Sequence, residues 1–158
     1  MRRKRTYKKH YQPDVRYGRI DVGRFINYVM RDGKKSIAEK IVYGAFDKIA
    51  KKTGEDPVKV FERAIENASP LLEVVSRRIG GANYQIPQEV RPERKFILAA
   101  RWIVAAIRSK KGKSSIDRLA EELLAAARNE GEAVRKKQEM HKVAEANRAF
   151  AHFARSRR

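Results

Sequence analysis

Apolar residues recur with the period of an α-helix through most of this 158-residue chain. In the first run, apolar side chains stand at positions i, i+3, i+4, i+7 and i+8, namely Val22, Phe25, Ile26, Val29 and Met30. Runs of similar spacing cover residues 37–49, 61–68, 96–107 and 116–127. Because an amphipathic helix must bury its apolar face, the pattern predicts a mainly α-helical protein with a shared core.

Local signals predict where these helices begin and end. Asp56 and Pro57 form an N-cap followed by proline at the first helical position, and Ser69-Pro70 closes the same helix. Residues 36–39 and 114–117 both have the pattern of a capping box, which would open the second and fifth helices. Residues 132–154 predict a sixth helix with few large apolar groups, which indicates shallow packing or a free helical tail.

Residues 72–90 depart from the helical period. Two runs rich in β-branched and aromatic residues flank residues 80–83 (GGAN), which predicts a two-stranded hairpin. An isolated ribbon is marginal in water, so this hairpin needs a surface to pack on. The expected fold is a bundle of about six helices with a protruding β-hairpin. It would form a single domain over residues 19–158, preceded by a basic arm over residues 1–18.

Positive charge is concentrated in three blocks. The chain has 38 Lys and Arg against 19 Asp and Glu, a formal net charge of +19. Residues 1–24 hold nine basic and two acidic residues, residues 76–113 hold ten and two, and residues 128–158 hold nine and four. Such a surplus destabilises a compact chain unless an anionic partner neutralises it. Nucleic acid is the first candidate for that partner and a membrane surface is the second.

Enzymatic chemistry has little support in the sequence. There is no cysteine, which excludes a disulfide framework, a thiolate zinc site and a thiol nucleophile. His141 and His152 stand about 16 Å apart along a helix, too far for one metal ion. Glu121-Glu122 is interpreted as a solvated pair. The longest apolar stretch, 96–107, is too short to cross a bilayer. We therefore expect no enzyme, no metal, no cofactor, no small-molecule substrate and no membrane partner.

The candidate contacts to nucleic acid are basic residues in four settings. The first setting is the arm, where tyrosines are interleaved with the basic residues. The other three are the turn before the second helix, the first strand of the hairpin, and the fourth helix together with the loop that follows it. The predicted set is Arg2, Arg3, Lys4, Arg5, Lys8, Lys9, Lys34, Lys35, Arg77, Arg78, Arg91, Arg94, Lys95, Arg101, Arg108, Lys110, Lys111 and Lys113.

Each setting has a simpler alternative. Residues 34–35 could bind a phosphate at the N-terminus of the second helix. Alternatively, they are two solvated lysines in a turn. Arginines on adjacent strand positions could contact nucleic acid on both faces of a ribbon, or only protect a strand edge. Arg94, Arg101 and Arg108 stand seven apart, so they share one helix face that suits phosphate contact or simple solvation. The arm could also be a localisation signal or a disordered solubilising tail.

Four motifs resemble small-subunit ribosomal protein seven, and they span residues 25–153. They read FINYVMRDGKKSIAEKIVYGA (25–45), SRRIGGANYQIP (76–87), AARW (99–102) and AEANRAFAHF (144–153). They are most similar to the bacterial and plastid members of that family. The resemblance implies a protein of the small ribosomal subunit, in the cytoplasm or in a plastid or mitochondrion.

The resemblance also implies particular partners. Members of the family bind the 3′ major domain of 16S rRNA, nucleate assembly of the head, and lie near the decoding region. Their hairpin reaches toward mRNA and the exit-site tRNA, and their last helix lies near that tRNA and ribosomal protein eleven. In this chain the corresponding positions are Gly80, Gly81, Asn83, Tyr84, Lys136, Lys137, Lys142 and Arg148. On matching positions, the resemblance assigns RNA contacts to Lys34, Lys35, Arg77, Arg78, Arg94, Lys95 and Arg101.

Three other classes remain as rivals to a ribosomal protein. A DNA-binding protein could use the same helical core and ribbon, but should prefer duplex DNA over rRNA. An RNA-modifying enzyme would need a nucleophile, metal or cofactor motif. A membrane-surface protein would need an exposed apolar face beside its basic residues.

Overall fold

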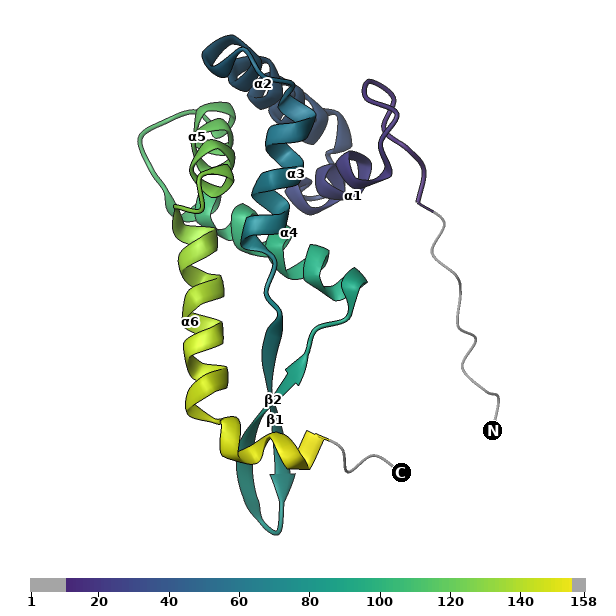
Figure 1. Ribbon diagram of the computed structural model, residues 1–158. Helices are drawn as coiled ribbons and strands as arrows, with labels where there is room; N and C mark the ends of the chain where they lie inside the picture. The colour runs from purple at the N-terminus through teal and green to yellow at the C-terminus, as the bar shows by residue number, and fades with distance from the viewer. Residues whose placement is uncertain (1–10, 155–158) are drawn as a thin grey trace, which may run out of the picture.

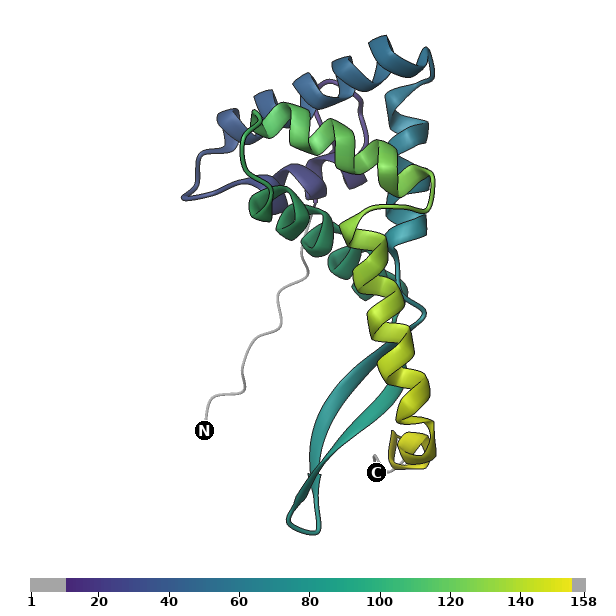
Figure 2. The same ribbon diagram turned by 90° about the vertical axis from the view of Figure 1, so that its left-hand side faces the viewer.

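The computed structural model describes residues 11–154 and confirms the predicted fold class. Its elements are α1 (Ile20–Val29), α2 (Lys35–Thr53), α3 (Pro57–Ala68), β1 (Leu72–Ile79), β2 (Ala82–Glu89), α4 (Pro92–Ser109), α5 (Ser115–Ala127), α6 (Glu132–Ala146) and the 3₁₀ helix η1 (Arg148–Ala154). Figure 1 shows α1 to α5 as one body, from which α6 and the hairpin extend in the same direction. At the far end η1 crosses the hairpin in the view of Figure 1, and the hairpin tip extends beyond η1 (Figure 2).

The core lies between α1, α2, α3, α4 and α5, and α5 packs against α2, α3 and α4. The rings of Phe25 and Phe46 pack against Phe61 with centroid distances of 5.1 and 5.6 Å, which joins the first three helices. Leu119 on α5 and Ile103 on α4 are fully buried. Among the described helices α4 has the most buried residues, as its wide apolar face predicts.

Most predicted helix ends are confirmed. The Asp56 side chain accepts a hydrogen bond from the Val58 amide at 3.0 Å, and Pro57 follows as the first helical residue. The Ser114 hydroxyl accepts from the Asp117 amide at 3.2 Å at the start of α5. At the end of α2, Gly54 takes a left-handed φ of 70°, a conformation that glycine adopts without strain.

The predicted start of the second helix is wrong. This helix begins at Lys35, so Ser36 lies inside its first turn and caps nothing. The side chain of Ile37 is exposed, whereas Ala38 and Val42 face the core. Ala45 and Ile49 at the other end of the predicted face are fully buried, so only the first turns of the buried face lie one residue later than predicted.

The hairpin is tighter than predicted. Its two strands are antiparallel, with Val75 opposite Ile86 and Arg77 opposite Tyr84. Only Gly80 and Gly81 form the turn, at φ values of 57° and 93°. Positive φ at both positions is typical of two-residue hairpin turns and strongly favours glycine. The remainder of the predicted connection, residues 82–83, belongs to β2.

The helix predicted over 132–154 does not continue to its expected end. The α-helix stops at Ala146, and the chain bends into η1. Asn147 marks the bend, and its side-chain amide donates to the Val143 carbonyl at 2.8 Å. Beyond the bend, Phe150 and Phe153 pack against Tyr84 of the hairpin, which supplies the support that the ribbon needs.

Part of the predicted arm is also folded. Asp14 is 93% buried by its neighbours, with 7% of its surface exposed. Tyr17 packs on Phe46 with a centroid distance of 5.3 Å. Residues 14–18 therefore belong to the helical body, and the predicted arm contacts at residues 2–9 lie outside the described residues.

Candidate nucleic-acid interface

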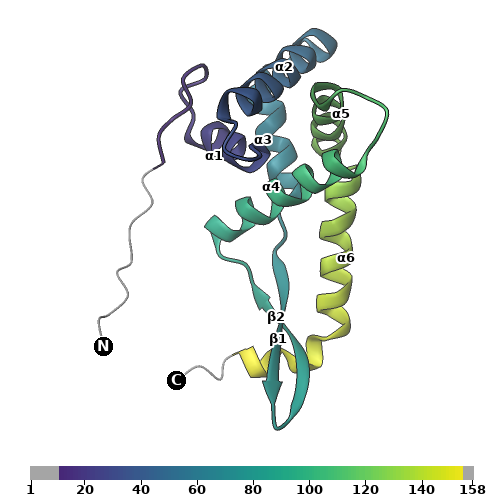
Figure 3. The ribbon, with the colours of Figure 1, turned by 180° about the vertical axis from the view of Figure 1, so that it is seen from behind.

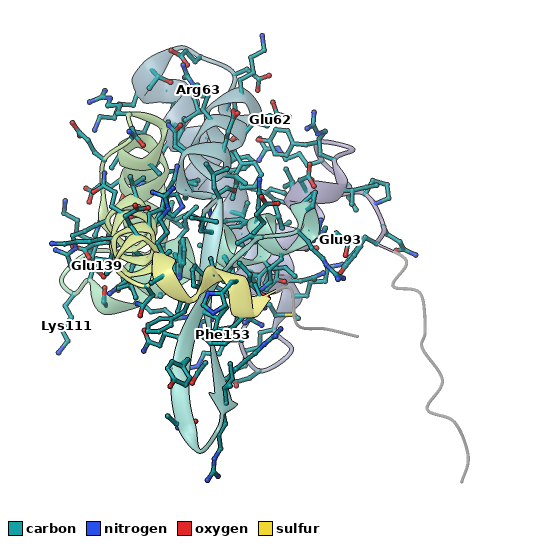
Figure 4. All side chains as sticks on the ribbon, turned by 60° about the horizontal axis from the view of Figure 1, so that its bottom comes forward. Glu62, Arg63, Glu93, Lys111, Glu139 and Phe153 are labelled. Atoms are coloured by element: carbon teal, nitrogen blue, oxygen red, sulfur yellow. The ribbon has the colours of Figure 1, made fainter. Side chains whose placement is uncertain are left out.

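Ion pairs hold several of the cations on the side of the molecule formed by α2, α3 and α5, although Lys51, Lys52 and Lys59 there are exposed. Five cations there have carboxylate partners, in the pairs Arg16–Asp47, Arg19–Glu62, Lys48–Asp117, Arg63–Glu55 and Lys113–Glu121. The hydrogen bond from Lys113 lowers the pKa of the Glu121 carboxyl below its usual range. Figure 4 places Glu62 and Arg63 at the end of the view opposite the hairpin tip. Exposed pairs add little stability, but each cancels one positive charge.

The exposed side of α4 carries cations without such partners. Arg101 and Arg108 lie on the same helix face and border a depression of about 640 Å³ with Tyr28 and Ala105. Among the described residues, no carboxylate lies within 4.0 Å of either guanidinium. Arg108 also borders a second depression of about 340 Å³, which it shares with Arg31 at the end of α1. We call the surface of Tyr28, Arg31, Arg101 and Arg108 the α1–α4 face; Figure 3 views the molecule from the side on which α4 lies.

Other predicted residues of this region differ in their surroundings. Arg94 is the first of the three arginines that are spaced seven residues apart. It pairs with Glu73 at 3.2 Å, so its charge is partly cancelled. Arg91 is exposed at the N-cap of α4, whereas Lys95 is half-buried. Lys34 is exposed at the N-cap of α2, where prediction placed it.

Arg24 belongs to the same surface but was not predicted. Its guanidinium lies 4.4 Å from the ring centre of Phe96 and 4.8 Å from that of Tyr11, within the range of cation–π attraction. Phe96 also lies 6.5 Å from Tyr28, so aromatic rings and cations alternate along this side. The two rings that flank Arg24 are far from it in the sequence, so no local pattern could have identified it.

The two faces of the hairpin are unlike. Arg77 is half-buried and donates to the Phe153 carbonyl at 3.4 Å, on the face that η1 covers (Figure 4 labels Phe153). Tyr84 lies on that covered face too, at 5.2 Å from the ring of Phe150. Arg78 is exposed on the other face, opposite Asn83. The prediction of freely presented arginine on both faces is therefore wrong for Arg77, and Tyr84 is a packing residue. Gly80, Gly81 and Asn83 remain exposed at the tip.

A buried carboxylate organises the basic loop after α4. Glu122 is 0% exposed, and one of its oxygens lies 2.5 Å from Lys110 Nζ. The other oxygen accepts from the Ala133 amide at 3.0 Å, at the start of α6. The interpretation of Glu121-Glu122 as a solvated pair is therefore wrong for Glu122. Lys113 pairs with Glu121, whereas Lys111 is exposed and extends from the ribbon (Figure 4).

The predicted residues of α6 mostly contact their own chain. Lys137 donates to the Asn67 carbonyl at 2.8 Å. Lys136 pairs with Glu139 at 2.7 Å, and Arg148 pairs with Glu145 at 3.4 Å across an exposed turn. Lys142 is exposed. These contacts leave fewer available cations here than the sequence indicates.

Residues 11–154 lack two other kinds of site. No helix in that range is both long and apolar enough to span a bilayer. Nor does that range contain a cluster of three or more acidic or histidine side chains that could hold a metal ion.

Comparison with known proteins gives a consistent result. A family model described as ribosomal protein S7p/S5e matches residues 1–148. Small ribosomal subunit protein uS7 of Fervidobacterium nodosum is 57% identical over 153 residues, which cover 97% of this chain and 99% of that protein. The proteins of the same name from Thermotoga maritima and Dechloromonas aromatica are 55% and 53% identical, over 97% and 96% of this chain and 99% and 97% of their own lengths. The predicted resemblance is confirmed: this chain belongs to the S7p/S5e family of ribosomal proteins, which are structural and not enzymatic components of the ribosome.

Proposed function

We propose that this chain binds the 3′ major domain of 16S rRNA as a primary binding protein and nucleates assembly of the head of the small subunit. The α1–α4 face carries this proposal, because Arg101 and Arg108 are exposed on one helix face with no carboxylate within 4.0 Å among the described residues. Arg101 and Arg108 stand about 10 Å apart along the helix axis, so they can contact separate phosphates.

The mode of recognition follows from the shape of RNA. A-form RNA hides its base edges in a deep groove, so proteins read its phosphates, its 2′-hydroxyls and its shape. A rigid helical body with cations at fixed positions can hold RNA helices in one orientation, and that arrangement would let later proteins bind. No bond chemistry is required.

Within the helical body and the hairpin, we propose fewer RNA-contacting residues than the sequence predicts. We retain the exposed cations with no close carboxylate, namely Lys34, Arg78, Arg91, Arg101, Arg108 and Lys111. We add Arg24 of α1 and Arg31, which follows α1 and pairs loosely with Asp32 at 3.9 Å. Lys110 is left out because it donates to the buried Glu122 carboxylate, and Lys137 is left out because it donates to the Asn67 carbonyl. The arm cations at positions 2–9 stay in the proposal on their charge alone.

The far end of the molecule suits the other partners. The hairpin extends from the body with its glycine tip exposed, and Arg78 lies on its open face. We place this tip near mRNA and the exit-site tRNA. Between the hairpin and α6, Val74, Trp102 and Val143 line a hollow of about 370 Å³ that suits a protein neighbour such as ribosomal protein eleven. The relatives named above are bacterial, which supports a location in the cytoplasm.

Footprinting tests the proposal directly. Hydroxyl-radical cleavage of 16S rRNA should be reduced by the full chain only within the 3′ major domain. The double variant Arg101→Ala, Arg108→Ala should lose most of that protection. The matched control Arg19→Ala, Arg63→Ala removes the same charge from the ion-paired side and should keep it. A preference for duplex DNA over this RNA in competition would reject the proposal.

A further inference from the structure

A cavity of about 310 Å³ lies beside the α1–α4 face, where residues 11–15 cross α1 near the start of α2. Its lining includes Tyr11, Gln12, Arg24, Asn27, Lys35 and Glu39. Small-molecule sites are commonly of about this size or larger, and a paired RNA helix is far too wide to enter. The cavity can therefore take a group of the size of a single nucleotide base, but not a paired helix.

The walls of this cavity are fixed before any ligand arrives. The Asp14 carboxylate accepts from the Tyr17 amide at 3.0 Å and from the Tyr43 hydroxyl at 2.7 Å, which ties the loop to α2. On the other side the loop lies directly on α1, since a Cβ at Gly23 would stand 3.0 Å from the Gln12 carbonyl oxygen. Ile26, which is 1% exposed, forms an apolar floor. A ligand would thus meet a formed site and would not have to order the loop.

The lining offers what an unpaired nucleotide needs. The ring of Tyr11 is 42% exposed and held by the Arg24 guanidinium, so one of its faces is available for stacking. The Asn27 amide and the Glu39 carboxylate can bind the edge of a base. Lys35 can bind its phosphate, because its side chain is mostly exposed and its ion pair with Glu39 is loose, at 3.9 Å.

We propose that this cavity holds one unpaired guanine nucleotide of the bound RNA, stacked on Tyr11 with its phosphate at Lys35. Guanine is favoured because its N1–H and N2–H donate side by side to a single carboxylate, here that of Glu39. The inference rests on the proposed function, and it adds base-specific recognition to contacts that otherwise read only phosphates and shape.

Base-specific chemical probing separates this inference from the proposed function. The full chain is bound to the 3′ major domain of 16S rRNA, and unpaired guanines are probed with kethoxal, which reacts at N1 and N2. One guanine should be protected in the wild-type complex. In complexes with Glu39→Gln or Asn27→Ala it should become reactive while the backbone footprint stays unchanged. The control Glu66→Gln changes an exposed carboxylate on α3 outside the cavity and should keep the protection.

Affinity gives a second readout. Tyr11→Ala should weaken binding on the order of tenfold through loss of the stack, and Lys40→Ala on the outer side of α2 should not. An intact backbone footprint with no base whose reactivity differs between wild type and Glu39→Gln would overturn the inference alone. A missing backbone footprint would overturn the proposed function and this inference with it. If no guanine responds, the other bases are probed with dimethyl sulfate and a carbodiimide, and protection of one of them with the same sensitivity to the variants would support the site and overturn the choice of guanine.

Discussion

A single buried carboxylate, Glu122, links the loop after α4 to the start of α6. It lies 2.5 Å from Lys110 and accepts from the Ala133 amide at 3.0 Å, with no exposed surface of its own. Removing one partner of a buried pair leaves the other group unsatisfied. We expect Glu122→Ala to lower the free energy of unfolding by about 3 kcal/mol, measured by urea denaturation.

The neighbouring residue supplies the control for that change. Glu121 pairs with Lys113 at the surface, where solvent screens the attraction. Glu121→Ala should therefore leave the urea midpoint almost unchanged. Equal losses in the two variants would mean that burial of the Glu122 carboxylate has no special weight in this fold.

His141 makes the attachment of α6 sensitive to pH. Its Nε2 accepts from the Leu71 amide at 3.0 Å, which requires the neutral ring. Burial, and then the nearby Lys137 charge, lowers the pKa of His141 below its ordinary value of 6.5. The unfolded chain therefore binds the proton first as pH falls. This contribution to stability is present above about pH 6.5 and is lost as pH falls through the lowered value.

The pH dependence can be isolated by substitution. Between about pH 7 and pH 5 the free energy of unfolding should fall more steeply for the wild type than for His141→Gln, whose amide oxygen can still accept from Leu71. His152→Gln, an exposed change on η1, should follow the wild type. Parallel curves for the wild type and His141→Gln would show that this histidine does not set the pH response.

At the scale of elements, the hairpin and η1 support each other through aromatic contacts. The ring of Tyr84 lies 5.2 Å from that of Phe150 and 5.8 Å from that of Phe153. We expect Tyr84→Ala to cost about 2 kcal/mol, because each such aromatic pair adds roughly 1 kcal/mol. Hydrogen exchange should quicken in β2 and η1 and stay slow in α4. The control Asn83→Ala, at the neighbouring position on the open face, should change neither the free energy of unfolding nor the exchange rates.

Short-range signals predicted the elements that depend on neighbours in sequence. The cap at Asp56 and the glycines of the hairpin turn need only local geometry, and both are present. The end of α6 was not predictable, because the bend at Asn147 accompanies contacts with Tyr84, more than sixty residues earlier. The partners of Arg24 escaped prediction for the same reason. Charge counts locate a basic block, but only the fold decides which cations already have a carboxylate.

For the whole molecule, the placement of charge matters more than its total. The formal net charge is +19. Ion pairs hold several cations on the side of α2, α3 and α5, whereas Arg101 and Arg108 on the α1–α4 face have no carboxylate within 4.0 Å among the described residues. Paired cations keep their carboxylates close, so they attract a polyanion less than free ones do. Binding of RNA should therefore depend on which two arginines are removed, even when the net charge changes equally.

The salt dependence of binding measures this difference. Each phosphate contact adds about 0.7 to 0.9 to the slope of log K against log salt. Arg101→Ala with Arg108→Ala should make the slope shallower by about 1.5, since two contacts are lost. Arg19→Ala with Arg63→Ala removes the same charge from ion pairs and should leave the slope near that of the wild type. If both double variants change the slope equally, net charge and not the α1–α4 face governs the association.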